Sequence, residues 1–285
     1  MTPVDYCRQK VGKPGSSFYY STLFLPVVKR DAIVILHAYF SEVAEVIDEC
    51  KEPAVAKVKL EWWREETCNV FAGRPRHLIG KALVSVIDNY GATVEPLLDF
   101  IDGVNMDIDQ ARYDSFKDLR LYCERVGSTM ALLSTRVLEY TEAPTLDYAR
   151  ELGVARTLTG IVRNIGSDIR RNRLYVPTED LTRFDVLVAD IMNRTENDGF
   201  RALIEHQIAR AETHYERAMQ QLPEKDRLAQ LPGLILAAID RIVLNEIRHD
   251  GYPVLRERLT LPPLRKLWVA WKTRFREKRR NRRSR

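Results

Sequence analysis

The chain has 285 residues, of which 45% are hydrophobic and 30% charged, with 13 Gly and 13 Pro. This length and apolar content suffice for one well-buried core, and they exclude a chain that is disordered throughout. No apolar run reaches the roughly 18 residues of a membrane-spanning helix, and four Cys without CxxC spacing or a secretory leader indicate reduced thiols in the cytosol.

Helical segments are predicted along most of the chain. Thr2 is a suitable cap for a first helix that has Pro3 in its first turn and ends at Gly12. Further helices are expected at 18–25, 29–50, 54–72, 78–90, 95–110, 115–140, 146–172, 200–222 and 234–250, separated mostly by Pro or Gly. No strand alternation persists. We therefore predict an all-α bundle of about eight to ten helices around a common core.

The end of the chain differs in composition. Residues 265–285 contain eleven Lys or Arg and one acid, a net charge of +10, which leaves −5 for residues 1–264. We therefore divide the chain into a helical domain, 1–262, and a basic tail, 263–285. One face of the tail helix is apolar and the other cationic, with Leu264, Leu267, Trp268, Trp271 and Phe275 on the apolar face.

This amphipathic pattern is typical of a helix that lies on an anionic membrane surface. It predicts a cytoplasmic protein that is peripheral at the inner face of the membrane. The alternative is that the first half of the tail packs on the bundle while the rest is a solvated charge run. Nothing else in the chain resembles a nucleic-acid-binding module, so we expect no nucleic-acid partner.

Two runs have acidic residues at a helical spacing that suits metal binding. They are Ser41-Glu-Val-Ala-Glu-Val-Ile-Asp-Glu49 and the run 161–177, IVRNIGSDIRRNRLYVP. Carboxylates four residues apart share one helix face, and Mg²⁺ bridges such oxygens to substrate phosphates. Asp48 and Asp168 are present, but Ala44 and Asn164 stand four residues before them.

These runs resemble the squalene/phytoene synthase family, most closely its bacterial presqualene diphosphate synthases. The resemblance extends over roughly residues 5–270 and includes 16–26, 42–49, 56–66, 101–113, 121–126, 163–177 and 251–258. It implies a single-domain isoprenoid synthase helical bundle with a central apolar pocket. It also implies prenyl transfer that joins two farnesyl-type diphosphates head to head with Mg²⁺, in squalene, hopanoid or carotenoid synthesis.

The resemblance also assigns candidate site residues. It implies Asp48 and Asp168 as catalytic residues, and as metal ligands Glu45, Asp48, Asn164 and Asp168. The implied substrate-binding residues are Ser17, Phe18, Arg112, Tyr122, Arg163, Arg173 and Tyr175. The chain departs from the family pattern at Ser41, Ala44, Glu45, Gly160, Asn164 and Ser167, and at His37 and Asp240, where the family usually has Tyr.

Loss of an anionic ligand from each pair predicts weakened or lost Mg²⁺ binding and impaired catalysis. Glu45 compensates in part by its length, and Asn164 offers a carbonyl oxygen without charge. An alternative is a non-catalytic relative that acts with a protein partner as an assembly factor for a membrane respiratory complex, since such relatives also have an Ala-x-x-x-Asp pattern. A third interpretation is altered chemistry, such as diphosphate hydrolysis or binding of another isoprenoid.

Overall fold

The computed structural model describes residues 1–50, 52–109 and 112–283, and within them the regular secondary-structure elements are helices joined by turns and loops. Within these ranges the one β interaction is an isolated parallel bridge between Arg112 and Leu174. The prediction of an all-α fold is therefore confirmed. Position 110, the last residue of one predicted helix, lies outside the described residues.

The ends of the early helices follow the predicted signals. The Thr2 side chain accepts a hydrogen bond from the Asp5 N–H and Asp5 bonds back to Thr2, so α1 begins with a capping box. The helices of the first half are α1 (Pro3–Val11), α2 (Ser17–Thr22), α3 (Val27–Glu49), α4 (Pro53–Phe71), α5 (Leu78–Tyr90) and α6 (Val94–Asp109).

The second half contains longer helices and several short turns of helix. They are α7 (Phe116–Cys123), a π-helical turn (Glu124–Ser128), α8 (Thr129–Leu138), α9 (Pro144–Asp168), a 3₁₀ turn (Ile169–Arg171), α10 (Thr178–Arg183), α11 (Val188–Met192), α12 (Asp198–Gln221), α13 (Leu231–His249) and α14 (Pro263–Arg283). The short helices α10 and α11 lie where the sequence pattern predicts none.

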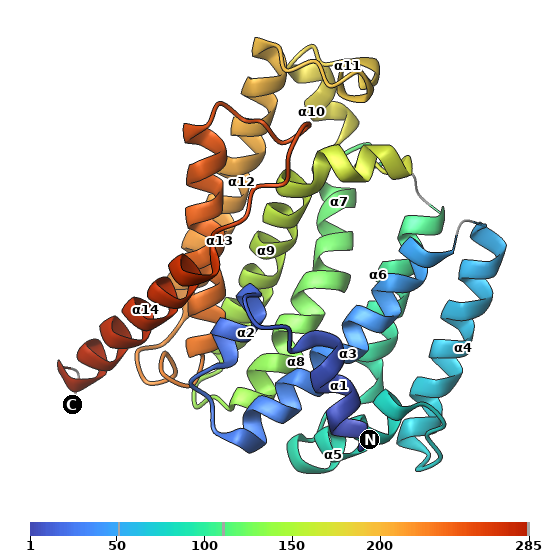
Figure 1. Ribbon diagram of the computed structural model, residues 1–285, viewed down its shortest axis with the longest axis vertical. Coiled ribbons are helices and arrows are strands. Elements are labelled where there is room, and N and C mark those ends of the chain that lie inside the picture. The colour runs from blue at the N-terminus through green and yellow to red at the C-terminus, as the bar shows by residue number, and fades with distance from the viewer. Residues whose placement is uncertain (51, 110–111, 284–285) are drawn as a thin grey trace.

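The helices pack around two buried clusters. α7, α8 and α9 run through the middle of the molecule, with α12, α13 and α14 on one side and α3, α4 and α6 on the other (Figure 1). One cluster lies mainly among α7, α9, α12 and α13, and the second among α1, α3, α4, α5, α6 and α8. The helices thus bury their apolar stripes against one another. The acidic run 161–177 contributes apolar residues to the first cluster and the run 41–49 to the second.

The predicted helix 115–140 is not continuous. A π-helical turn, Glu124–Ser128, separates α7 from α8. It packs against α9 at Gly153, where an added Cβ would collide with the backbone of Ser128. A π turn contains one more residue than an α turn and shifts the side chains that follow it. This close contact therefore sets which residues of α8 face α9.

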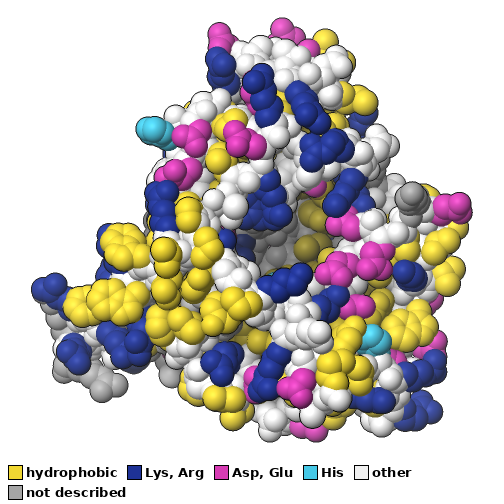
Figure 2. All heavy atoms as spheres, viewed as in Figure 1, with side chains coloured by type: hydrophobic (Ala, Val, Ile, Leu, Met, Phe, Trp, Pro, Cys, Tyr) yellow, Lys and Arg dark blue, Asp and Glu magenta, His cyan; other side chains and the backbone are white. Residues whose placement is uncertain are grey.

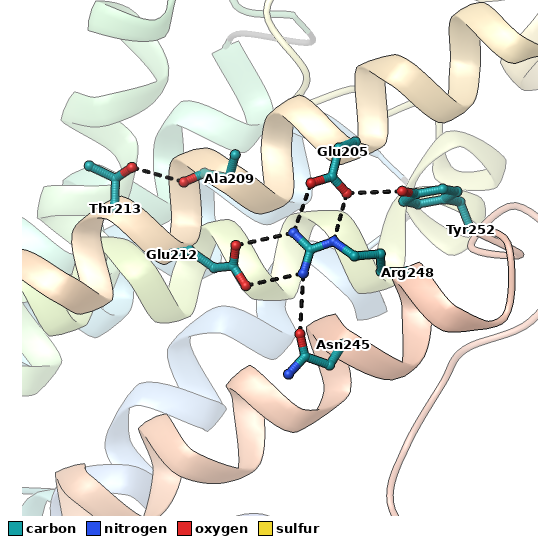
Figure 3. Close-up of polar contacts among 7 residues, drawn as sticks. All are labelled: Glu205, Ala209, Glu212, Thr213, Asn245, Arg248 and Tyr252. Carbon is teal, nitrogen blue, oxygen red and sulfur yellow. Dashed lines mark hydrogen bonds and ion pairs between the residues drawn. The ribbon is translucent and has the colours of Figure 1, made fainter.

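A charged network joins α12 to α13. Arg248 of α13 forms ion pairs with Glu205 and Glu212 of α12, with N–O distances of 2.8 and 3.1 Å (Figure 3). The Tyr252 hydroxyl donates to Glu205 at 2.9 Å. The hydrogen bond from Arg248 lowers the pKa of Glu205. A planar guanidinium binds two carboxylates at once, so this network fixes the relative positions of the two helices.

The C-terminal helix α14 packs along α13 and α2. Its buried positions include Lys266, Val269, Thr273 and Glu277. The large apolar side chains of its other face are exposed, with 80% of Leu264, 56% of Trp268, 57% of Trp271 and 60% of Phe275 accessible. Across the described ranges, none of the helices combines the length and the apolar character that a bilayer crossing requires.

Candidate functional site

Three carboxylates lie at the ends of three helices and act on one another electrostatically. Asp48 lies in the last turn of α3, Asp107 in the last turn of α6, and Asp168 is the final residue of α9. Burial raises the pKa of Asp168 to about 6; the charges of Arg173 and Arg171 oppose the shift, and those of Asp107 and Asp48 add to it. The C-terminal end of a helix carries partial negative charge, which also disfavours an anion there. The arrangement therefore favours a cation.

The positively charged partners of Asp48 are arginines of the segment that follows α9. Arg171 and Arg173 form ion pairs with its two oxygens at 2.8 and 2.9 Å. Arg173 also donates to the backbone carbonyl of Ile47 at 2.8 Å. The two acidic runs are thus brought together, as predicted, but through arginines of the second run. Arg173 is held by Asp48 and is half-buried, while Arg171 is more exposed.

Asp107 is the acceptor for two of the predicted substrate residues. Tyr175 donates to it at 2.8 Å and Tyr122 at 3.2 Å. Burial raises the pKa of Asp107 to about 6, although the hydrogen bond from Tyr175 opposes the shift. Sequence reasoning missed Asp107 as a site residue. Its position in the matched run 101–113 was the one available signal.

The remaining metal positions are only partly brought together. Glu45 forms an ion pair with Lys10 of α1 at 2.6 Å, and Lys10 also pairs with Glu42 at 2.7 Å. Asn164 lies one turn before Asp168, and its Oδ1 atom is buried without a hydrogen-bond partner among the described residues. Among all the residues that the structure describes, no group of three or more His, Cys, Asp or Glu side chains is arranged to hold a metal ion.

The oxygen donors that are present fit a single hard cation. Asp168 offers a carboxylate and Asn164 an unpaired carbonyl oxygen on the same helix face. Mg²⁺ often takes only one or two protein ligands and completes its shell with water and substrate phosphates. Neither Ala44 nor Ser167 carries a carboxylate, so these residues do not provide the second paired site that the family resemblance implies.

A basic cluster is formed by Arg163, Arg258 and Lys266. Arg163 is largely buried, and its Nε has no hydrogen-bond partner among the described residues. Burial lowers the pKa of Arg163, and the charge of Arg258 lowers it further, while Asp240 opposes the shift. Lys266 donates to the Gly15 carbonyl at 3.1 Å, and its pKa is lowered by burial and by Arg163 and Arg258. Such a concentration of cations is suited to a polyanion.

Arg258 and Lys266 were also missed as site residues. Lys266 belongs to the C-terminal helix, whose basic residues the sequence pattern assigns to a membrane surface. Only the packing of α14 on α2 and α13 shows that this lysine is buried beside Arg163. On the face shown in Figure 2, a hollow lies between Lys and Arg side chains on one side and Asp and Glu side chains on the other.

Three of the other predicted residues lie apart from these charged contacts. Ser17 begins α2. Arg112 pairs with Leu174 through the backbone and its side chain is exposed. Phe18 stacks on His37, with ring centroids 3.9 Å apart. The substrate roles of Ser17, Arg112 and Phe18 stay predictions.

A cavity of 260 Å³ lies between α2, α3, α8, α9 and α13. Its lining is mostly apolar and includes Phe18, Ile33, Met130, Leu152 and Leu236. Pockets that bind small molecules are typically apolar hollows with a few polar groups. The cavity therefore matches the central apolar pocket expected from the resemblance.

Comparisons with known proteins agree with this arrangement. The squalene/phytoene synthase family model matches residues 11–265. The 15-cis-phytoene synthase of Synechocystis is 32% identical over 282 residues, which cover 94% of this chain and 84% of that protein. The corresponding enzyme of Synechococcus elongatus is also 32% identical, with 92% and 89% covered.

Solved structures show the same fold. A dehydrosqualene synthase in complex with a ligand superposes with a TM-score of 0.85 at 26% identity, over 97% of both chains. The squalene synthase HpnC from Alicyclobacillus acidocaldarius gives a TM-score of 0.78 at 24% identity, over 88% of this chain and 94% of that one. With a family model that spans most of its length and relatives of this similarity, the chain belongs to the squalene/phytoene synthase family.

Proposed function

We propose that this chain binds a prenyl diphosphate such as farnesyl diphosphate and is a diverged head-to-head synthase related to presqualene diphosphate synthases. The observation that carries the proposal is the basic cluster Arg163, Arg258 and Lys266, taken together with an apolar cavity that is bordered by α9, the helix that carries Arg163. A diphosphate needs several cations and an isoprenoid chain needs an apolar wall. Both are provided by this arrangement.

The proposed roles follow from the contacts. Arg163 binds phosphate oxygens with the donors that lack a protein partner, and Arg258 and Lys266 add charge beside it. Tyr122 and Tyr175 hold Asp107 at the edge of the site. Asp168 and Asn164 would hold a single Mg²⁺ ion, which when bound would neutralise diphosphate charge and favour its departure.

The proposed impairment of catalysis rests on Asp48. Its two oxygens are occupied by Arg171 and Arg173, and position 44 offers no second carboxylate. The departing diphosphate therefore lacks one of the two paired ligand sets that the family uses. We infer that the chain binds a prenyl diphosphate better than it ionises it.

The experiment is a thermal-shift titration of the full chain with farnesyl thiolodiphosphate, with and without Mg²⁺. Binding to the native state raises the unfolding midpoint. A rise that Arg163→Met abolishes, and that Arg150→Met on the exposed side of α9 does not, supports the proposed site. Incubation with radiolabelled farnesyl diphosphate then measures turnover. No shift at any Mg²⁺ concentration contradicts the proposal and favours a non-catalytic protein with a protein partner.

We further propose that α14 contacts an anionic membrane surface at the inner face of the membrane. Its exposed Leu264, Trp268, Trp271 and Phe275 gather on one face, and Lys and Arg side chains lie beside this apolar patch (Figure 2). Lys272 lies over the Trp268 ring at 4.7 Å, with its charge at the edge of the patch. Such a face buries apolar rings among headgroups while its cations meet anionic lipids.

A further inference from the structure

The wall of the apolar cavity contains one permanently charged side chain. Among the described residues that line it, Arg156 of α9 is the sole Lys, Arg, Asp or Glu. A guanidinium loses hydration when a hydrocarbon chain fills the space beside it. Arg156 is therefore an unexpected residue for a pocket that takes an unsubstituted isoprenoid.

The charge of Arg156 is balanced within the protein, but its hydrogen-bonding capacity is not used up. Its Nε donates to Asp240 at 3.1 Å, and the Tyr215 hydroxyl donates to the same oxygen at 3.2 Å. Asp240 is buried. The terminal nitrogens of Arg156 have no hydrogen-bond partner in the described part of the chain. The Arg156–Asp240 pair has no net charge. Because a guanidinium has five N–H donors, Arg156 still offers donors to a ligand.

Two further polar groups of the cavity wall also lack hydrogen-bond partners among the residues described. The His37 ring stacks on Phe18 and has no hydrogen bond. Burial and then the charge of Arg156 lower the pKa of His37 to about 4, so the imidazole is neutral at pH 7. The Tyr148 hydroxyl is buried without a partner. His37, Tyr148 and Arg156 all line the same cavity, so three polar groups with unused hydrogen-bonding capacity face one ligand space.

We propose that the ligand of this cavity carries an uncharged oxygen, a hydroxyl or carbonyl, on its isoprenoid chain, and that Arg156 and His37 bind this oxygen. A neutral acceptor fits better than a carboxylate because Asp240 already balances the charge of Arg156. The inference rests on the proposed function only in taking the ligand to be an isoprenoid. Arg156 is then a specificity-determining residue, distinct from the basic cluster that binds diphosphate.

The test uses probes without a diphosphate group. Binding of the hydrocarbon farnesene and of two C15 alcohols, farnesol and nerolidol, is measured by equilibrium dialysis of the full chain. The double variant Arg156→Met/Asp240→Asn removes both charges, so no buried carboxylate is left unpaired, and the amide oxygen introduced at position 240 still accepts from Tyr215. The matched control is Arg150→Met, on the same helix with an exposed ion pair to Asp147.

We expect the ratio of the farnesene dissociation constant to that of at least one alcohol to fall by about ten-fold in the double variant, and not in the control. Comparing ratios removes the different water solubility of the probes. An unchanged ratio for both alcohols, or no binding of any of the three probes, would overturn the inference. This result can be told apart from failure of the proposed function. If only the proposed function fails, farnesyl thiolodiphosphate does not bind, but the chain still prefers an alcohol to farnesene.

Discussion

Arg227 donates two hydrogen bonds to Glu277, at 2.7 and 3.3 Å, and both side chains are buried. Glu277 is the one acidic residue of α14. Arg227, in the loop before α13, therefore holds α14 through Glu277, the single negative charge of that helix. This contact fixes which face of α14 packs on the bundle and which face presents the tryptophans.

Glu277→Gln should lower the free energy of unfolding by about 3–5 kcal/mol, because it leaves Arg227 buried without its counter-charge. Urea denaturation of the full chain at pH 7 measures the effect. Glu246→Gln is the matched control, since Glu246 pairs with Arg265 at the surface and its loss should cost less than about 1 kcal/mol. Equal effects of the two substitutions would show that the buried pair does not hold α14.

Acidification should stabilise the site. Burial raises the pKa of Asp107 and of Asp168 to about 6 from 3.8. The folded state therefore binds more protons than the unfolded state between about pH 4 and 6, and these groups make the free energy of unfolding decrease as pH rises through that range. Asp168→Asn should raise stability at pH 7 by about 1–2 kcal/mol and reduce this slope.

Metal-free denaturation curves at several pH values measure this dependence. Asp88→Asn, at an exposed position of α5, provides the control for the loss of one negative charge. A slope that is identical in wild type and Asp168→Asn would contradict the assignment of the proton uptake to this cluster.

Restoring the family's ligands should strengthen metal-dependent binding. The triple variant Ala44→Asp/Gly160→Asn/Asn164→Asp is sterically feasible, because Ala44 is exposed and a Cβ on Gly160 would meet nothing within 4 Å. We expect its dissociation constant for farnesyl thiolodiphosphate with Mg²⁺ to fall about ten-fold, since Mg²⁺ gains carboxylate ligands. Calorimetry measures it, with Ala54→Asp as the charge control. Unchanged affinity would refute the argument from lost ligands.

Membrane contact is tested by cosedimentation with vesicles of phosphatidylcholine and phosphatidylglycerol. Trp268→Ala/Trp271→Ala should weaken binding about ten-fold or more, because two exposed indole rings are lost from the apolar face of α14. Trp62→Ala, on α4, should leave it unchanged. Binding should also fall as salt rises. Wild-type protein that stays in the supernatant with anionic vesicles at low salt would contradict the proposal.

Local signals predicted the helices well, and long-range contacts account for most differences. Thr2 and Gly12 bound α1 as expected, because capping depends on neighbours in the chain. The π turn at 124–128 was not predictable, since it is fitted to Gly153 on another helix. In the same way, helical spacing identified Glu45 as a possible ligand but not its partner Lys10, which comes from α1.

The roles of the family-matched site residues stay predictions. The fold does join the two acidic runs, because Arg173 of the second run pairs with Asp48 of the first. Lys266 reaches Arg163 only because α14 folds back over α2. In the sequence, a lysine that faces a membrane and a lysine that is buried beside Arg163 look alike. Only tertiary packing shows which of these two positions Lys266 has.

The arginines around Asp48 have a consequence for the divergence that we propose. Anions at the ends of three helices are a locally frustrated arrangement, which a bound cation relieves in a metal-dependent enzyme. Here Arg171 and Arg173 relieve it at Asp48 from within the chain, while Asp107 and Asp168 keep raised pKa values. Under the proposed function, folding would not depend on a bound metal to balance Asp48, and substitutions at the ligand positions would leave stability largely unchanged. Such a scaffold would tolerate changes at the metal site that the fold itself does not register.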